Sequence, residues 1–321
     1  MGTELEPGDL RLAVVGSGRS GTNWLMLVLG HLFDAYPFGV LDWDTAAGRF
    51  QEPPASSAFA RLRRRLHPHN YSTWEGLWSI LPERFILHAH WVASPPVVAA
   101  VESNHVRVIT MVRHPFEVML SHLAWVNRSR GDIGLPFLKG ITPRSRAFID
   151  FASGPIGKQF MSVTTSWWVR PDTLRVKYEE MVEDPGAVGQ TLIEQLGDEP
   201  RTSVAEALDA GSAERLRPTK SGALGGLLSD RRYAALLAPW GPFFRRAAAP
   251  AVRANLRGRN YYWQGSPGLW RRLLPEAEAK EIAAGQHDVM TFFGYECDFD
   301  PDLTADQADA NWRELLAGNP R

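Results

Sequence analysis

One stretch near the start of the chain limits the possible fold more than any other. A short apolar run, Arg11–Val15, leads into a turn with glycines at Gly16, Gly18 and Gly21, and a second apolar run, Asn23–Phe33, follows. The pattern predicts a buried strand, a tight turn and a mostly buried helix. Such a unit points consecutive backbone N–H groups and a helix N-terminus at one place, which favours binding of an anion.

The rest of the chain continues the alternation of strands and helices. Further strands are predicted at Arg84–Ala89, Val106–Val112 and Thr173–Tyr178. Helices are predicted after the N-cap residue Ser94 to Glu102, from Pro115 to Val126, over Lys158–Val169, from Asp184-Pro185 to Leu196, over Pro275–Phe292 and over Thr304–Ala317. Alternating strands and helices indicate an α/β fold with a parallel sheet flanked by helices.

The composition is that of a folded protein. Hydrophobic residues make up 44% and charged residues 22% of the 321 residues, close to globular averages. We expect one domain over residues 1–321, in which 34–83 and 197–260 form an irregular helical cap and substrate segments and 296–321 forms a tail. Cys297 is the lone cysteine, which excludes a disulfide framework and any cysteine-based metal site.

Charge and hydropathy narrow the classes of partner. The net charge of −1 does not favour general nucleic-acid binding. The first residues lack a basic segment before an apolar run, and no apolar run reaches the roughly 18 residues of a membrane span, so we expect a cytoplasmic protein. Only five of the 35 cationic residues are lysine, so an anion site would depend mainly on arginine, whose forked guanidinium suits phosphate.

The turn is compatible with three nucleotide-binding patterns, and two of them, the dinucleotide fingerprint and the Walker loop, match only in part. Arg19 adds a cation and Ser20 a hydroxyl to the backbone donors. The glycine spacing matches a dinucleotide fingerprint with Asp42 about 20 residues on, but bulky Trp24 follows the third glycine, where that fold packs helix closely on strand. The turn matches half of a Walker loop, from Gly16 to Gly21, but it lacks the Lys-Ser/Thr pair that binds phosphate and magnesium in such loops.

A second segment supports a phosphate ligand independently. The predicted strand Val106–Val112 is followed by Arg113, and Ser121 lies eight residues further on, in the helix that Pro115 begins. The guanidinium is a fork-shaped donor and the serine hydroxyl a neutral one, and both suit a phosphate group.

Together these segments resemble the sulfotransferases that use 3′-phosphoadenosine 5′-phosphosulfate (PAPS). The family's 5′-phosphosulfate loop has Lys or Arg followed by Ser-Gly-Thr-x-Trp, as in Arg19–Trp24. Its 3′-phosphate motif has an arginine at a strand end and a serine eight residues later, as here, with His114 where the family often has Asp. The segment Leu174–Pro185 is similar to a further family segment, in which a tyrosine, here Tyr178, lies near the adenine. The resemblance implies a P-loop-like, three-layer core.

The resemblance also implies the cofactor site. The residues expected to bind PAPS, or its product 3′-phosphoadenosine 5′-phosphate (PAP), are Arg19, Ser20, Gly21, Thr22, Asn23, Trp24, Arg113, Ser121, Tyr178 and Gly265. Trp24 is expected to stack on the adenine. Gly265 begins a late Gly-x-x-Gly-x-Trp segment, but Trp263-Gln264 stands where relatives carry an Arg-Lys phosphate contact. Arg257 and Arg259 are the candidates to replace that contact.

Two histidines are candidates for the proton acceptor. His88 and His90 lie at the end of a predicted strand, where alternation places both on one face. Relatives carry Lys-Thr-His at this strand end, and His90 aligns best with that histidine, so we expect it to act as the general base. The role of His88, a cofactor contact or a support for another residue, stays open, and a metal site at His88-x-His90 has no third ligand marked nearby.

The sequence therefore predicts a PAPS-dependent sulfotransferase. Arg19 is expected to neutralise the charge that develops on the leaving phosphate, and this chemistry requires no metal. The acceptor would be a hydroxyl of a small molecule or a carbohydrate, met by aromatic side chains such as Trp74, Trp78, Trp91 and Trp125. The cluster Arg61–Arg65 would suit an acidic acceptor. The oligomeric state is not predicted. The alternatives are a P-loop kinase of a small molecule and a non-catalytic nucleotide-binding protein.

Overall fold

The centre of the structure is a parallel sheet of five strands. The computed structural model describes residues 9–39, 43–44, 49–50, 73–79, 81–128, 135–212 and 266–317. The strand order is β2-β5-β1-β6-β7, with every neighbouring pair parallel. The strands are β1 (Leu10–Gly16), β2 (Tyr36–Gly39), β5 (Arg84–Ala89), β6 (Arg107–Val112) and β7 (Leu174–Lys177), and a separate antiparallel pair joins β3 (Trp43–Asp44) to β4 (Arg49–Phe50). The predicted parallel sheet is confirmed.

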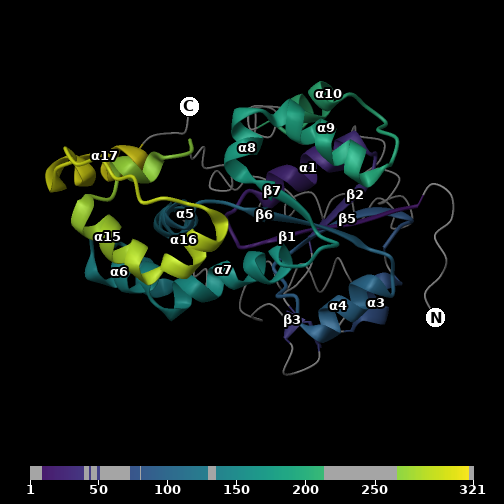
Figure 1. The fold of residues 1–321 in the computed structure, drawn as a ribbon, viewed down its shortest axis with the longest axis horizontal. Helices are drawn as coiled ribbons and strands as arrows, with labels where there is room; N and C mark the ends of the chain where they lie inside the picture. Colours follow the sequence, from purple (N-terminus) through teal and green to yellow (C-terminus); the bar gives the residue numbers. More distant parts are fainter. Residues whose placement is uncertain are drawn as a thin grey trace, which may run out of the picture.

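Alternate residues of β1 face opposite sides of the sheet and recruit different helices. Leu12 and Val14 pack into a core with helices on one face, and Ala13 and Val15 pack into a core on the other. The first face carries α1 (Thr22–Leu32), α8 (Tyr178–Glu183), α9 (Pro185–Leu196) and α10 (Val204–Ala210), above the sheet in Figure 1. The other face carries α3 (Trp74–Trp78), α4 (Pro95–Glu102) and α7 (Pro155–Trp168). The result is a three-layer α/β core.

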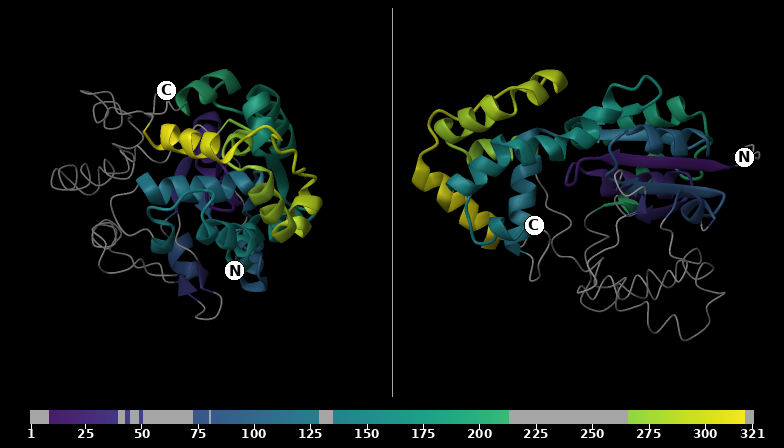
Figure 2. Two further views of the ribbon diagram at one scale, coloured as in Figure 1. Left: turned by 90° about the vertical axis from the view of Figure 1, so that its left-hand side faces the viewer. Right: turned by 90° about the horizontal axis from the view of Figure 1, so that it is seen from below.

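A third group of helices packs beside the sheet around its own core. Its members are α5 (Pro115–Arg128), the 3₁₀ turns η1 (Pro136–Leu138) and η3 (Leu269–Arg272), α6 (Arg146–Ser153), α15 (Glu276–Gly285), α16 (His287–Phe293) and the tail helix α17 (Ala305–Ala317). Figure 2 shows this group, coloured teal to yellow, at one end of the sheet. Trp312 of α17 is buried in that core, so the tail helix docks on the body of the protein. Because α5 begins directly after β6 ends, this group lies at the carboxyl end of that strand.

The structure corrects several element boundaries. The predicted helix Pro275–Phe292 is two helices, α15 and α16, with a break at Gln286, whose buried side chain donates from Nε2 to the Ala152 carbonyl at 2.6 Å. Tyr178, predicted as a strand end, begins the helix α8 instead. Ser94 occupies the N-cap of α4 without a capping side-chain bond, whereas Asp184 caps α9 through the Ala187 amide. Neither α6 nor β2 was predicted.

Much of the predicted cap lies outside the described residues. This holds for most of 34–83 and 197–260, including Arg61–Arg65, and also for Gly265, Arg257 and Arg259. Among the helices that are described, none is both long and apolar enough to cross a membrane.

Candidate anion-binding site

Four segments that are distant in the sequence meet at one edge of the sheet. The glycine turn follows β1, His90 follows β5, Arg113 follows β6 and Tyr178 follows β7. Because the strands are parallel, their carboxyl ends share an edge, which is where open α/β sheets bind ligands. Three of the segments that carry the family resemblance are therefore brought together. Of the fourth segment, Gly265 is outside the described residues, and Trp270 is buried with its ring stacked 5.3 Å from that of His114, the neighbour of Arg113.

The turn after β1 is held in shape by bonds from within and from α7. Ser17 donates its backbone N–H to Thr164 Oγ1 at 2.9 Å, and Thr164 in turn donates to the Met111 carbonyl at 3.2 Å. The Ser20 hydroxyl is buried and donates to the Ser17 carbonyl at 2.7 Å. Arg19 adopts φ 70°, in the left-handed region. The Ser20 hydroxyl therefore closes the turn on itself, and its predicted contact with a cofactor remains a prediction.

The start of α1 supplies donors for an anion. Gly21 occupies the N-cap with φ 102°. A Cβ there would also come within 2.6 Å of the Tyr178 ring, so both the backbone angle and the space demand glycine. Thr22 and Asn23 are the first helical residues, and amides at such positions lack acceptors inside the helix. The helix therefore begins where a bound phosphate would meet its amides and the positive end of its dipole.

The second phosphate segment contacts the turn directly. Ser121 Oγ accepts a hydrogen bond from Arg19 Nε at 3.0 Å, and Arg113 Nη1 donates to the Arg19 carbonyl at 3.4 Å. Ser121 and Arg113 are about 100 residues from Arg19 in the sequence, and both are almost fully buried. Two arginine side chains and a serine hydroxyl thus meet at the mouth of the turn.

Arg113 is oriented by a buried carboxylate and an aromatic ring. Glu117, one helical turn along α5, accepts from Arg113 Nη2 at 2.6 Å and Nε at 3.1 Å through its Oε2 atom. The guanidinium carbon lies 4.3 Å from the centre of the Tyr178 ring, a cation–π contact. With Nε and Nη2 engaged by Glu117, the Nη1 edge of the fork is the one turned toward the glycine turn.

The Tyr178 ring also meets the first turn of α1. The Trp24 and Tyr178 rings lie edge to face with their centres 6.3 Å apart. Burial raises the pKa of the Tyr178 hydroxyl, so it stays neutral at working pH. The pair forms an aromatic wall beside the turn, and its expected contact with an adenine remains a prediction.

His90 contacts the turn through one ring nitrogen. Its Nδ1 lies 2.6 Å from the Gly16 carbonyl oxygen. A carbonyl oxygen can only accept a hydrogen bond, so Nδ1 must carry the proton and the neutral ring keeps a lone pair on Nε2. The tautomer set by Gly16 is therefore the one in which Nε2 can accept a proton from a substrate hydroxyl.

His88 lies beside His90 but contacts a different part of the site. The two rings are 4.8 Å apart, as strand alternation predicts, and His88 Nε2 lies 2.8 Å from Thr22 Oγ1. Burial and the neighbouring His90 ring lower the pKa of His88 well below its usual value, so it is neutral. His88 therefore contacts Thr22, one of the residues predicted to bind the cofactor. Among the described residues no group of three His, Cys, Asp or Glu side chains could hold a metal ion.

The predicted aromatic pocket is divided by the structure. Trp91 is buried in the core below the sheet, and Trp74 and Trp78 pack against that core. Trp125 on α5 instead lies beside the turn, with its ring centre 5.8 Å from the Arg19 guanidinium carbon. Of these four, only Trp125 is placed by its contacts at the mouth of the site.

Several residues that hold the site were not predicted. Glu117, Thr164 and His122 contact Arg113, Ser17 and Gly18 respectively. Glu117 and His122 carried a local signal, because they lie on the same predicted helix as Ser121. Thr164 had none, since its partner is 147 residues away.

Comparison with known proteins gives similarity at the level of structure alone. No family model matches the sequence, and no curated protein matches it significantly. Structural matches include mouse sulfotransferase SULT7A1 complexed with PAP, at 18% identity over 66% of this chain and 68% of that chain, TM-score 0.45. A second match is retinol dehydratase in complex with androsterone and inactive cofactor PAP, at 14% identity over 93% of this chain and 84% of that chain, TM-score 0.45. A third is a sulfotransferase from Alicyclobacillus acidocaldarius, at 17% identity over 77% of this chain and 98% of that chain, TM-score 0.33. These similarities assign no residue roles in this chain.

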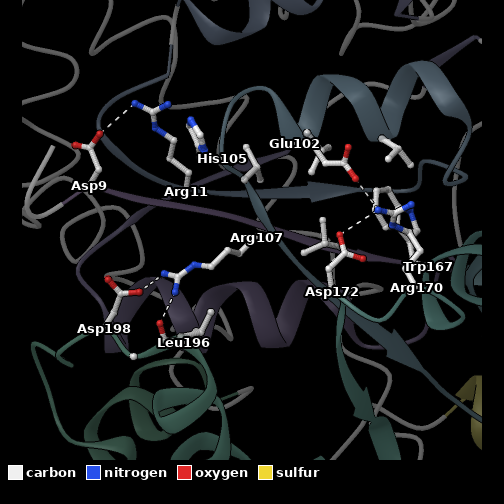
Figure 3. Close-up of a pocket in the computed structure, with 15 residues that line it drawn as sticks. Asp9, Arg11, Glu102, His105, Arg107, Trp167, Arg170, Asp172, Leu196 and Asp198 are labelled. Atoms are coloured by element: carbon white, nitrogen blue, oxygen red, sulfur yellow. Dashed lines mark hydrogen bonds and ion pairs between the residues drawn. The ribbon is translucent and has the colours of Figure 1, made fainter. Parts of the chain in front are cut away.

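A cavity of about 550 Å³ lies at the opposite edge of the sheet, by the amino ends of β1 and β6. Figure 3 shows its arginines turned toward carboxylates: Arg11 to Asp9, Arg107 to Asp198, and Arg170 to Glu102 and Asp172. Each cation that lines this cavity is thus paired with an acid. None of the predicted site residues lines it, so the candidate site is the carboxyl edge.

Two buried histidines near the site predict how stability depends on pH. Burial lowers the pKa of His114 to about 4, and burial with the nearby Arg19 lowers that of His122 to about 3. In the unfolded chain both return to about 6.5, so unfolding takes up protons below that pH. Stability is therefore fully present above pH 6.5 and falls at lower pH, by about 2 kcal/mol per histidine between pH 7 and pH 5.

Urea unfolding at pH 7, 6 and 5 measures this loss. The variant His114→Gln serves as the control, because an amide side chain does not titrate and the dependence on pH should become shallower. An unfolding free energy that stays level from pH 7 to pH 5 would contradict the assignment of neutral, buried rings.

Proposed function

We propose that this protein is a sulfotransferase that moves the sulfonate group of PAPS to a hydroxyl of a small-molecule or carbohydrate acceptor. The observation that carries the proposal is the meeting of Arg113 and Ser121 with the glycine turn at Arg19, at 3.4 Å and 3.0 Å. The turn and the start of α1 suit one phosphate, and Arg113 with Ser121 suits a second one close by. A nucleotide with phosphates on both the 3′ and the 5′ oxygen of its ribose fits such a pair of sites.

The same residues account for the steps of the transfer. The acceptor hydroxyl gives its proton to His90 Nε2 as its oxygen forms a bond to sulfur. The bond from sulfur to the bridging oxygen breaks, and the electron pair and the negative charge pass to the 5′-phosphate of PAP. The amides at the start of α1 and the Arg19 guanidinium stabilise that charge. The positive end of the helix is fixed before reaction, so little reorganisation is needed.

Calorimetry with matched nucleotides tests the proposal. PAP and adenosine 5′-phosphate differ only in the 3′-phosphate, so PAP should bind about 100-fold more tightly if Arg113 and Ser121 hold that group with charge-assisted hydrogen bonds. Binding should be unchanged by a chelator of magnesium. Transfer of labelled sulfonate from PAPS to a panel of sugars, phenols and fused-ring alcohols then identifies the acceptor.

The alternatives give different outcomes. Magnesium-dependent binding of ATP that is tighter than binding of PAP would indicate a small-molecule kinase. Tight PAP binding without transfer to any acceptor in the panel would indicate a nucleotide-binding protein without turnover. Equal affinity for PAP and adenosine 5′-phosphate would refute the assignment of the 3′-phosphate site.

A further inference from the structure

His122 lies under the glycine turn, on the side of α5. It follows Ser121 directly, and its Nε2 atom is 3.2 Å from the Gly18 carbonyl oxygen. The ring is in contact with the turn, since a Cβ built on Gly18 would lie 3.2 Å from His122 Cε1. Two consecutive residues of α5 therefore hold two consecutive residues of the turn: Ser121 contacts Arg19, and His122 contacts Gly18.

The surroundings of His122 determine its charge and its tautomer. The side chain is buried, with its ring centre 4.5 Å from that of Phe160 and 6.3 Å from that of Trp125. Burial and the nearby cation of Arg19 keep the ring neutral, with a pKa of about 3. Because the Gly18 oxygen accepts, Nε2 carries the single proton, and the buried Nδ1 has no hydrogen-bond partner among the described residues. The ring is thus a fixed neutral donor.

The geometry of the peptide bond carries this contact into the site. The described residues contain no cis peptide, and in a trans peptide the C=O and the following N–H point in opposite directions. A Gly18 carbonyl held by His122 therefore turns the Arg19 amide hydrogen to the other side of the turn. Arg19 has φ 70°, a left-handed conformation that is unfavourable for a residue other than glycine and needs such support.

We propose that His122 is a positioning residue that, through the Gly18 carbonyl, holds the turn in the shape that binds the 5′-phosphate of the nucleotide. This inference rests on the proposed function, since it names the nucleotide. His122 touches no substrate and moves no proton. Its contribution is to donate one hydrogen bond that fixes the Gly18–Arg19 peptide before the ligand arrives.

His90 and His122 each donate a hydrogen bond to a different carbonyl of the turn. His90 donates to Gly16 through Nδ1, and His122 donates to Gly18 through Nε2. The spare nitrogen of His90 is on a half-buried ring at the sheet edge, whereas the spare nitrogen of His122 is buried. Two identical side chains thus receive different roles, because only one of them leaves a lone pair where a substrate could reach it.

Two variants of His122 separate its hydrogen bond from its packing. His122→Phe keeps an aromatic ring between Phe160 and Trp125 but removes the donor, and His122→Gln places an amide donor where Nε2 was. With calorimetry, His122→Phe should bind PAP and adenosine 5′-phosphate about tenfold more weakly, by the same factor for both, because both carry the 5′-phosphate. His122→Gln should stay within about threefold of the wild type.

The outcomes separate this inference from the proposed function. Unchanged affinity of His122→Phe for both nucleotides would overturn the role of His122, as would a His122→Gln variant as weak as His122→Phe. A wild-type protein that binds neither nucleotide would refute the proposed function instead. In that case the role of His122 in binding the 5′-phosphate is overturned with it. If the Phe variant does not fold, ¹⁵N NMR of the wild type decides: a neutral ring protonated on Nε2 from pH 5 to 8 supports the inference, and any other state overturns it.

Discussion

Replacing His90 with alanine should abolish sulfonate transfer while leaving PAP affinity nearly unchanged. The His90 Nε2 atom is expected to take the proton from the hydroxyl of the acceptor substrate, so loss of the imidazole should lower kcat by about 10²- to 10⁴-fold. Binding should persist because the phosphates are expected to contact the turn, the start of α1 and the α5 residues, not this ring. Gly16, which His90 contacts, is also held by its pairing with β6, unlike Gly18. Labelled-sulfonate transfer and calorimetry with PAP measure the two effects separately.

A matched variant separates the two roles of His90, which are to accept a proton at Nε2 and to hold the Gly16 carbonyl through Nδ1. In the wild type, His90 Nδ1 lies 2.6 Å from the Gly16 carbonyl oxygen. His90→Asn carries an amide N–H in the place of Nδ1, so it should keep this hydrogen bond, but it has no basic nitrogen. It should be as inactive as His90→Ala and bind PAP like the wild type. Normal turnover of either variant would show that another group takes the proton, and His88, 4.8 Å away, would be the next candidate.

Removing the Arg113 side chain should cost both nucleotide discrimination and stability. Arg113→Ala leaves the Glu117 carboxylate, 1% exposed, without the cation that neutralises it. Breaking a buried ion pair on one side destabilises a protein by about 3–5 kcal/mol. The 3′-phosphate also loses its fork-shaped donor, so the preference for PAP over adenosine 5′-phosphate should fall to near one. Urea unfolding and calorimetry measure these two effects.

A double variant distinguishes lost binding from lost folding. Arg113→Met with Glu117→Met removes both charges and keeps comparable volume, so stability should largely recover. The preference for PAP should not recover, because the recognition of the 3′-phosphate depends on the guanidinium. A double variant that still prefers PAP as strongly as the wild type would place the 3′-phosphate elsewhere. The loss of preference for PAP that is expected of the double variant differs from the effect of His122→Phe, which should weaken the binding of both nucleotides equally.

Sequence reasoning located the strands β1, β5, β6 and β7, but not β2, because the signals that mark those four strands are local. The strand β1, the glycine turn and α1 follow one another within 23 residues, and their apolar periodicity and glycines are set by contiguous positions. The boundaries that failed have tertiary causes. Gly285 packs so closely on α6 that a Cβ would lie 2.3 Å from the Ser153 carbonyl oxygen, and buried Gln286 ends α15 by bonding to α6. No periodicity in the helix itself indicates such a contact.

The choice of residue types at the candidate site could likewise be made from the sequence. An arginine at a strand end with a serine eight residues later, and two histidines alternating at another strand end, are patterns of spacing along the chain. Only the folded chain decided how these groups are held. Glu117 orients the Arg113 fork, Gly16 sets the tautomer of His90, and Thr164 fixes the Ser17 amide from 147 residues away.

The division has a physical reason. Turn conformation, strand alternation and helix capping depend on neighbours within a few residues, so the amino-acid sequence by itself determined that a strand, a glycine turn and a helix come in this order. The direction of a hydrogen bond, the charge of a buried ring and the pairing of a buried arginine depend on groups that only folding brings close. For that reason His122 beneath Gly18, the residue on which the further inference rests, became visible only in the tertiary structure.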